Sequence, residues 1–228
     1  MKPLAIVLMS GGMDSTVCAS WALQQGFEVC ALHVHYGQKT QEREAQAFNE
    51  ICAVFRIDKI LDIDISHLAA IGGSSLTDST IDITKANLES SEIPTSYVPF
   101  RNANLLSIAV SWAEVIGAQT IIIGAVEEDG SGYPDCRRIF FDAFEAMIQL
   151  GTKPGSHIQI QTPLIASDKA EIVTLCMKLE APLELTWSCY SSSEKACGVC
   201  DSCALRLRGF AKAGYEDPIE YDQRPDYI

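Results

Sequence analysis

The segment that most constrains the fold lies near the N-terminus, where a short apolar run is followed at once by glycine and serine. Residues 4–9 read LAIVLM and residues 10–16 read SGGMDST. A short apolar run bounded by glycine is typical of a buried parallel strand, and the next residues predict a helix over 14–25. A corner between such a strand and helix presents backbone N–H groups and a helix N-terminus to an anion. We therefore expect an α/β protein with an anion site at residues 10–16.

The alternation of strand-like and helix-like segments continues along the chain. Further strands are expected over 29–35, 59–65, 120–125 and 158–164, and helices over 42–55, 102–117 and 138–150. Another helix is expected to begin near Asp168, which forms a capping-box pattern with Glu171. The stretch 66–99 is expected to be a long loop with short helical pieces, and such loops are often substrate lids. The pattern predicts a doubly wound, parallel five-stranded sheet with its ligand site at the carboxyl ends of the strands.

Length and charge narrow the class of protein. The 228 residues suit one domain with a small appendage, and we expect an α/β domain over 1–186 and a C-terminal region over 187–228 packed on it. The net charge of −13 argues against direct binding to nucleic acid. No apolar run reaches the roughly 18 residues that span a bilayer, and the N-terminal run is a poor signal peptide. We therefore expect a cytoplasmic protein that binds neither membranes nor nucleic acid.

Nine cysteines are present, and four of them lie close together. An odd count with no export signal favours reduced thiols. Cys189, Cys197, Cys200 and Cys203 offer four soft ligands with the tight Cys-x2-Cys spacing, which suits a structural zinc site. Two alternatives are four buried free cysteines and an iron–sulfur cluster. The proline that follows the last cysteine in ferredoxin runs is replaced here by Ala204, so zinc is favoured.

The SGGMDST segment has the chemistry of a phosphate loop. Glycines allow the backbone to approach a phosphate closely, and the hydroxyls of Ser10, Ser15 and Thr16 can donate hydrogen bonds to it. Asp14 would repel a phosphate unless it caps the helix or helps to hold a magnesium ion. The alternative is an ordinary strand–turn–helix corner, and neither GxxxxGK[ST] nor GxGxxG is present. The segment resembles the SGGxDS signature of the PP-loop ATP pyrophosphatase superfamily, whose members bind ATP at this corner.

Taken together, the motifs resemble one family of PP-loop enzymes, the 7-cyano-7-deazaguanine synthases of queuosine biosynthesis. The resemblance rests on YGQ at 36–38, PFRN at 99–102, EEDGSGYPDC at 127–136, LTWSCY at 185–190 and CGVCDSC at 197–203. Two departures are Phe100, where glycine is usual, and Lys39-Thr40, where a basic pair is more usual. Both are expected to affect only the rim of the pocket.

The resemblance implies an ATP-dependent C–N ligase that converts 7-carboxy-7-deazaguanine and ammonia into 7-cyano-7-deazaguanine, with Mg²⁺ bound to the ATP. It implies a homodimer. The residues expected to contact ATP are Leu8, Met9, Ser10, Gly11, Gly12, Met13, Asp14, Ser15, Thr16, Val17 and Cys18. Catalysis is assigned to Asp14, Ser15 and Arg101, and substrate binding to Arg101, Asp129, Tyr133 and Asp135. One structural zinc per chain would be held by Cys189, Cys197, Cys200 and Cys203.

Other readings stay open at this point. A PP-loop tRNA thiolase is the main alternative, although the acidic balance disfavours an RNA substrate. A glutamine-fed amidotransferase would need a glutaminase domain for which the chain is too short. Two smaller expectations are that His33 and His35, which alternate on one strand, face opposite sides, and that residues 216–228 form a solvated terminus.

Overall fold

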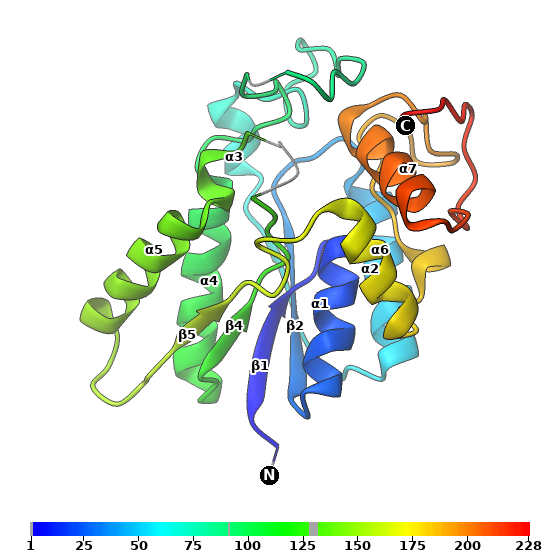
Figure 1. Ribbon diagram of the computed structural model, residues 1–228. Coiled ribbons are helices and arrows are strands. Elements are labelled where there is room, and N and C mark those ends of the chain that lie inside the picture. Colours follow the sequence, from blue (N-terminus) through cyan, green and yellow to red (C-terminus); the bar gives the residue numbers. More distant parts are fainter. Residues whose placement is uncertain (1, 91, 128–131) are drawn as a thin grey trace.

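A computed structural model describes residues 2–90, 92–127 and 132–228, and it contains a parallel sheet with helices on both faces (Figure 1). The strands are β1 (Leu4–Leu8), β2 (Glu28–His35), β3 (Lys59–Asp64), β4 (Thr120–Ile122) and β5 (Gln159–Gln161). Their order is β3-β2-β1-β4-β5, and every pair is parallel. The predicted doubly wound five-stranded sheet is confirmed. Strand β4 is shorter than expected, and residues 123–126, which follow it, line a cavity.

The helices divide between the two faces of the sheet. Helices α1 (Met13–Gln24), α2 (Gln41–Phe55) and α6 (Lys169–Lys178) cover one face, and α4 (Arg101–Ile116) and α5 (Arg138–Gly151) cover the other. Helix α7 (Asp201–Ala213) packs against α6. Between β3 and α4 the described chain forms only the short helix α3 (His67–Ile71), as expected of a long loop. Two 3₁₀ turns, Pro134–Cys136 and Leu183–Leu185, complete the described elements.

The central position of β1 explains its uninterrupted apolar sequence. Ala5 and Val7 belong to the hydrophobic cluster beneath α1 and α2, whereas Ile6 belongs to the cluster beneath α4 and α5. All three are completely buried. Because successive side chains of a strand point to opposite faces, only a strand covered on both sides needs apolar residues at every position.

The capping box predicted at the start of α6 is present. The Asp168 side chain accepts a hydrogen bond from the backbone N–H of Glu171, and the Glu171 side chain accepts one from the backbone N–H of Asp168. The two contacts satisfy N–H groups that the helix itself leaves unpaired. They fix the first turn of α6, which begins at Lys169.

The C-terminal tail is packed rather than solvated, so that expectation is wrong. Asp217 and Ile219 are buried, and Asp217 accepts two hydrogen bonds from the completely buried guanidinium of Arg206, at 2.7 and 2.9 Å. Near the end of the chain, the Tyr227 hydroxyl donates to the Gly198 carbonyl at 2.9 Å. A buried arginine needs an anionic partner, and the tail supplies it. The division of the chain after residue 186 stays a prediction.

Within the described chain, none of the helices combines the length and the apolar character needed to cross a membrane.

Candidate active site

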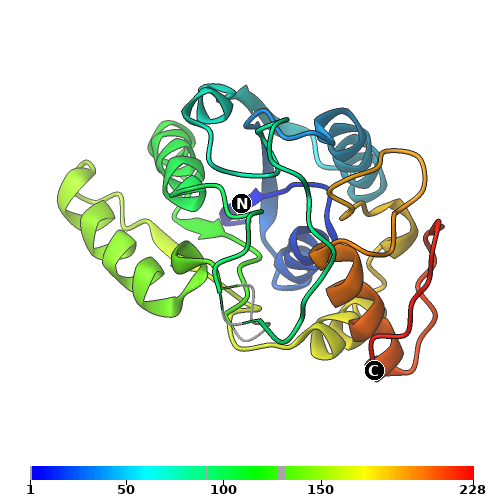
Figure 2. The ribbon, with the colours of Figure 1, turned by 90° about the horizontal axis from the view of Figure 1, so that it is seen from above.

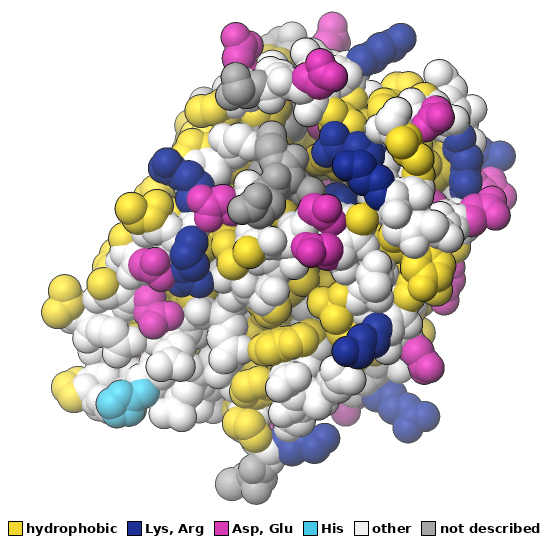
Figure 3. Space-filling view, in the orientation of Figure 1, with side chains coloured by type: hydrophobic (Ala, Val, Ile, Leu, Met, Phe, Trp, Pro, Cys, Tyr) yellow, Lys and Arg dark blue, Asp and Glu magenta, His cyan; other side chains and the backbone are white. Residues whose placement is uncertain are grey.

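A cavity of about 530 Å³ lies at the carboxyl ends of the strands. Its walls come from the loop after β1, the ends of β2 and β4, the start of α4, the segment 187–190 and the start of α7. Residues in the ranges 84–90 and 92–96 also contribute, and Figure 2 shows these two stretches passing over the carboxyl edge of the sheet near α7. A backbone hydrogen bond of 2.8 Å from Ala86 to the Val199 carbonyl holds the first stretch there. Figure 3 shows both basic and acidic side chains on the surface around this upper part of the molecule.

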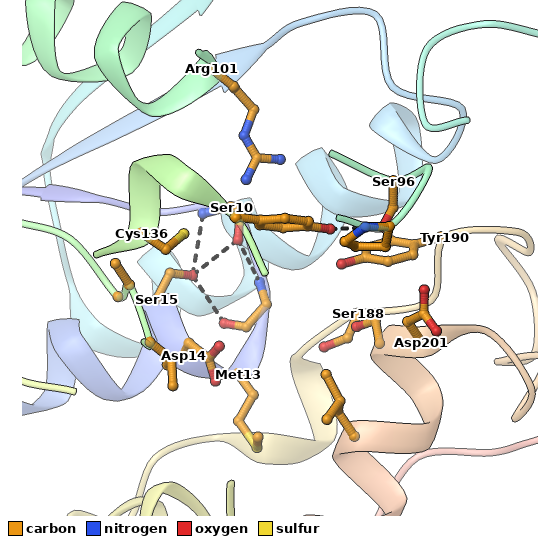
Figure 4. A pocket seen from close by; sticks show the side chains of 18 of the residues that line it. Ser10, Met13, Asp14, Ser15, Ser96, Arg101, Cys136, Ser188, Tyr190 and Asp201 are labelled. Atoms are coloured by element: carbon orange, nitrogen blue, oxygen red, sulfur yellow. Dashed lines mark hydrogen bonds between the residues drawn. The ribbon is translucent and has the colours of Figure 1, made fainter. Parts of the chain in front are cut away.

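The loop after β1 is held by its own hydroxyl groups (Figure 4). The Ser10 Oγ accepts from the Gly12 N–H at 3.2 Å and lies 3.3 Å from the Ser15 Oγ, which in turn donates to the Gly12 carbonyl at 3.0 Å. Gly11 has a φ of +83°, and a Cβ there would lie 2.6 Å from the Glu44 carbonyl oxygen. Glycine is therefore required both by the backbone conformation and by the contact with α2.

The predicted ATP segment is only partly exposed to the cavity. Its lining includes Leu8, Met9, Ser10, Gly12, Met13, Asp14 and Ser15. The described lining does not include Gly11, Thr16, Val17 and Cys18. Val17 and Cys18 are completely buried in the core beneath α1. A helix that starts at an anion site presents its first turn to the ligand and its following residues to the core, which is where Val17 and Cys18 lie; contact of the segment with ATP stays a prediction.

Asp14 does not cap helix α1, so that option for its role is wrong. The N-cap position is occupied by Gly12, and Asp14 lies inside the first turn. Its Oδ2 accepts from the Lys169 Nζ at 2.7 Å. Its Oδ1 is buried and has no hydrogen-bond partner among the described residues. Asp14 thus lines the cavity and has one buried carboxylate oxygen without a hydrogen-bond partner among the described residues.

Lys169 is a cavity residue that sequence reasoning missed. It is the first residue of α6, directly after the capping residue Asp168. The capping box could have indicated this position. It marks the start of α6, and a helix that follows a parallel strand begins at the carboxyl edge of the sheet, where ligands bind. Lys169 brings a positive charge to the side of the loop where Asp14 lies.

Arg101 lines the cavity from the first turn of α4, and its guanidinium points into the pocket (Figure 4). Its Nη1 donates to the Tyr36 hydroxyl at 3.1 Å, and the guanidinium lies 5.1 Å from the centre of that ring. Burial raises the pKa of Tyr36 to about 12, so the phenol is neutral at physiological pH and brings no negative charge to the arginine. Tyr133 also lines the cavity, and its hydroxyl lies 2.8 Å from the Ser96 Oγ.

The two acidic residues predicted to bind substrate have different outcomes. Asp129 lies outside the described residues. Asp135 is buried but is not part of the described cavity lining, and its Oδ2 accepts from the backbone N–H of Asn102 at 2.9 Å. Asp135 therefore holds the first turn of α4, which carries Arg101. Burial raises the pKa of the adjacent Cys136, which does line the cavity, to about 11, so it is a protonated thiol.

Phe100 precedes α4 with a φ of +57°. Glycine adopts this left-handed conformation without steric cost, which gives a physical reason for the glycine that is usual at this position. The Phe100 side chain is largely exposed and is absent from the described lining of the cavity.

His33 and His35 face the same side of β2, contrary to expectation. Their ring centres are 4.7 Å apart, because side chains two positions apart on a strand point to the same face. The Nδ1 of His33 lies 2.7 Å from the Met9 carbonyl, and its ring stacks on Phe48. Neither histidine is part of the described cavity lining.

Several further cavity residues had no assigned role in the sequence. Among them are Glu44, Trp187, Ser188, Tyr190 and Asp201. Both carboxylate oxygens of Glu44 accept hydrogen bonds, from Gln38 at 3.0 Å and from Thr40 at 2.7 Å, and burial raises its pKa. The segment 187–190 reaches the cavity because the Trp187 N–H donates to the Gly11 carbonyl at 2.9 Å.

The four predicted metal ligands are brought together. The Sγ atoms of Cys189, Cys197, Cys200 and Cys203 all lie within 4.8 Å of one another, and those of Cys197 and Cys203 are 3.9 Å apart. Tetrahedral zinc, with Zn–S bonds of about 2.3 Å, places its sulfurs roughly 3.8 Å apart. Backbone N–H groups of Val199 and Cys200 donate to the Cys197 Sγ at 3.4 and 3.3 Å. The cluster could hold a metal ion.

Comparison with known proteins connects this geometry to a family. The model of the family described as queuosine biosynthesis protein QueC matches residues 4–214. The chain belongs to the QueC family. A relative from Chlorobium phaeobacteroides (strain DSM 266) named 7-cyano-7-deazaguanine synthase is 62% identical over 224 residues, which cover 98% of this chain and 99% of the relative. A relative of the same name from Chloroherpeton thalassium is 61% identical with the same coverage.

Among solved structures, the QueC chain resembles a 4-thiouridine synthetase crystallised with RNA and bound ATP. The TM-score is 0.50 and the identity 18%, over 78% of this chain and 41% of the synthetase chain. This resemblance concerns the fold alone.

Proposed function

We propose that this protein converts 7-carboxy-7-deazaguanine and ammonia into 7-cyano-7-deazaguanine at the expense of ATP, as a ligase of queuosine biosynthesis. The observation that carries the proposal is membership of the QueC family, with relatives of about 60% identity that bear the synthase name over nearly their full length. The cavity supports it, because a phosphate-binding type of loop, an arginine and several aromatic rings line the same space.

The chemistry requires activation of an oxygen twice. A carboxylate is a poor electrophile until one oxygen is adenylylated or phosphorylated. Ammonia then attacks the carbon, the activated oxygen leaves with its phosphate group, and an amide forms. A second activation, now of the amide oxygen, followed by loss of that oxygen and of the N–H protons, leaves the C≡N group.

The chain's own residues would act mainly by positioning and by charge stabilisation. The hydroxyls of Ser10 and Ser15 and the N-terminus of α1 would bind phosphate oxygens. Arg101 would bind the substrate carboxylate or a phosphate, since a guanidinium matches such oxygens in pairs. Tyr133 and Asp129 would also contact the substrate. Asp135 would act indirectly, by fixing the helix that carries Arg101.

A magnesium ion entering with ATP would find one ligand in Asp14. The unpartnered Oδ1 of Asp14 fits a hard cation that prefers oxygen ligands. Bound Mg²⁺ would neutralise phosphate charge as the leaving group departs, and Lys169 would hold the Asp14 carboxylate in place.

The tRNA thiolase alternative has weaker support. Its support is a fold resemblance at 18% identity, whereas the close relatives are named synthases. The homodimer, the cytoplasmic location and the absence of nucleic-acid binding stay predictions.

The proposed activity has a direct test. Purified protein is incubated with 7-carboxy-7-deazaguanine, MgATP and an ammonium salt, and the products are followed by mass spectrometry. The expected products are the amide and then the nitrile. The activity would be refuted if neither product formed although the protein unfolded cooperatively and contained its full complement of metal.

For the metal, we expect about one zinc per chain and loss of that zinc in Cys200→Ser. Removing one of four thiolates opens the site, so the thermal midpoint should fall as well. Metal analysis of the purified protein measures the first effect and thermal unfolding the second. The matched control is Cys52→Ala, which removes a buried thiol outside the cluster and should retain the zinc. Iron and acid-labile sulfide in place of zinc would contradict the prediction.

A further inference from the structure

We infer that Asp201 reads the N1–H and 2-amino edge of the deazaguanine base, with Tyr190 lining the same subsite. This inference rests on the proposed function and assigns a specificity-determining residue to it. Asp201 is the first residue of α7, directly after the cluster cysteine Cys200. It lines the cavity together with Ser188 and Tyr190.

The cavity has two sides. Figure 4 shows Ser10, Asp14 and Ser15 on one side and Ser188, Tyr190 and Asp201 on the other, with Arg101 reaching in between them from above. The first group carries the proposed phosphate chemistry. A substrate whose carboxylate is to be activated must extend away from that loop, so its ring would lie toward the second group.

Asp201 differs from the other carboxylates that line the described cavity. Asp14 pairs with Lys169, and both oxygens of Glu44 already accept hydrogen bonds. Glu92 is exposed to solvent. In the described part of the chain, no lysine or arginine forms an ion pair with Asp201. Its carboxylate interacts with the backbone N–H of Asn87, which also lines the cavity. A carboxylate offers about four lone pairs, so it retains capacity to accept from a ligand.

The chemistry of the base matches this position. A 7-deazaguanine presents two adjacent donors, the ring N1–H and the 2-amino group, and a carboxylate accepts from both. The N-terminus of α7 favours a negative charge on its first residue. Tyr190 is half-buried beside the cavity and supplies ring surface for a planar ligand. Cys189 directly precedes Tyr190 and Cys200 directly precedes Asp201, so a metal ion bound by both cysteines would fix Tyr190 and Asp201 relative to each other.

The test compares Asp201→Asn with Asp222→Asn, an exposed aspartate in the same C-terminal region. Calorimetry would measure the Kd of 7-carboxy-7-deazaguanine and of the analogue that lacks only the 2-amino group. Wild-type protein should bind the analogue roughly 10- to 100-fold more weakly, as expected for loss of a hydrogen bond to a charged group. Asp201→Asn should weaken binding of the natural base by a similar factor and remove the discrimination. The Kd of ATP and the zinc content should not change in either variant.

Three results would overturn the assignment. In the first, wild-type protein converts 7-carboxy-7-deazaguanine but binds it and the analogue without the 2-amino group with equal Kd. This result can be interpreted without any variant. The second is Asp201→Asn with unchanged affinity and discrimination. The third is a variant whose ATP affinity falls while its affinity for the base is retained, which would place ATP at Asp201. Wild-type protein that neither binds nor converts the base would instead refute the proposed function, and this role with it.

Discussion

Replacing Asp14 with asparagine is expected to lower the rate of nitrile formation by about 100- to 1000-fold, the range seen when a group that stabilises transition-state charge is removed. Asparagine keeps the shape of the side chain but has no negative charge with which to bind a magnesium ion or to hold Lys169, which lies 2.7 Å away in the wild type. Product formation by mass spectrometry measures the rate. The affinity for ATP, measured with and without Mg²⁺, should lose its dependence on the cation.

The matched control is Asp142→Asn. Asp142 also forms an ion pair of 2.7 Å, with Arg138, but that pair lies on the exposed side of α5. Surface pairs of this kind contribute about 0–1 kcal/mol, so activity and stability should both stay close to the wild type. Turnover within about twofold of wild type in Asp14→Asn would remove Asp14 from the site.

Replacing Arg206 with methionine is expected to lower the free energy of unfolding by about 3–5 kcal/mol, because it leaves the buried Asp217 carboxylate without its cation. Both side chains are 1% exposed. The guanidinium also donates to the Thr186 Oγ1 at 2.7 Å, and Asp217 accepts from the Tyr221 hydroxyl at 2.6 Å, so one substitution disrupts the whole buried network. Denaturant unfolding at a fixed zinc concentration measures the loss, since metal binding to the native state adds to stability.

The same region offers the control for this prediction. Lys195 and Glu220 form a pair of 3.0 Å that is more than half exposed, so Lys195→Met should cost less than about 1 kcal/mol. The double variant Arg206→Met with Asp217→Leu should recover part of the stability, because no unpaired charge is then left buried. Equal losses in Arg206→Met and Lys195→Met would show that the buried network contributes little.

The sequence predicted the strands, the helices and the cysteine cluster because each has a local signal. The order of apolar and helical segments fixed the fold class, and the Cys-x2-Cys spacing identified four ligands that do converge. The glycines at 11 and 12 located the loop after β1. These features depend on contacts within a few residues along the chain or on the regular order of its elements.

Most of what the sequence did not predict depends on contacts between distant segments. Lys169 meets Asp14 across 155 positions, and no local pattern indicates that pair. The packed tail depends on Arg206 and Asp217, each of which looks like an ordinary charged surface residue in the sequence. The histidine error was different in kind, because the two-residue period of a strand already places His33 and His35 on one face.

The hydrogen bond from Trp187 to the Gly11 carbonyl has a consequence for how the protein is made on the ribosome. The glycine loop is synthesised before every other strand of the sheet, and β1 is the central strand, so β1 cannot pair on both sides until β2 and β4 have been made. The loop's contact with Trp187 comes from a segment that follows all five strands, and Asp217, the ion-pair partner of Arg206, is synthesised later still. A nascent chain therefore cannot complete the contacts of the loop after β1 until the segment around Trp187 has left the ribosome, so the cavity closes only after all five strands have been synthesised.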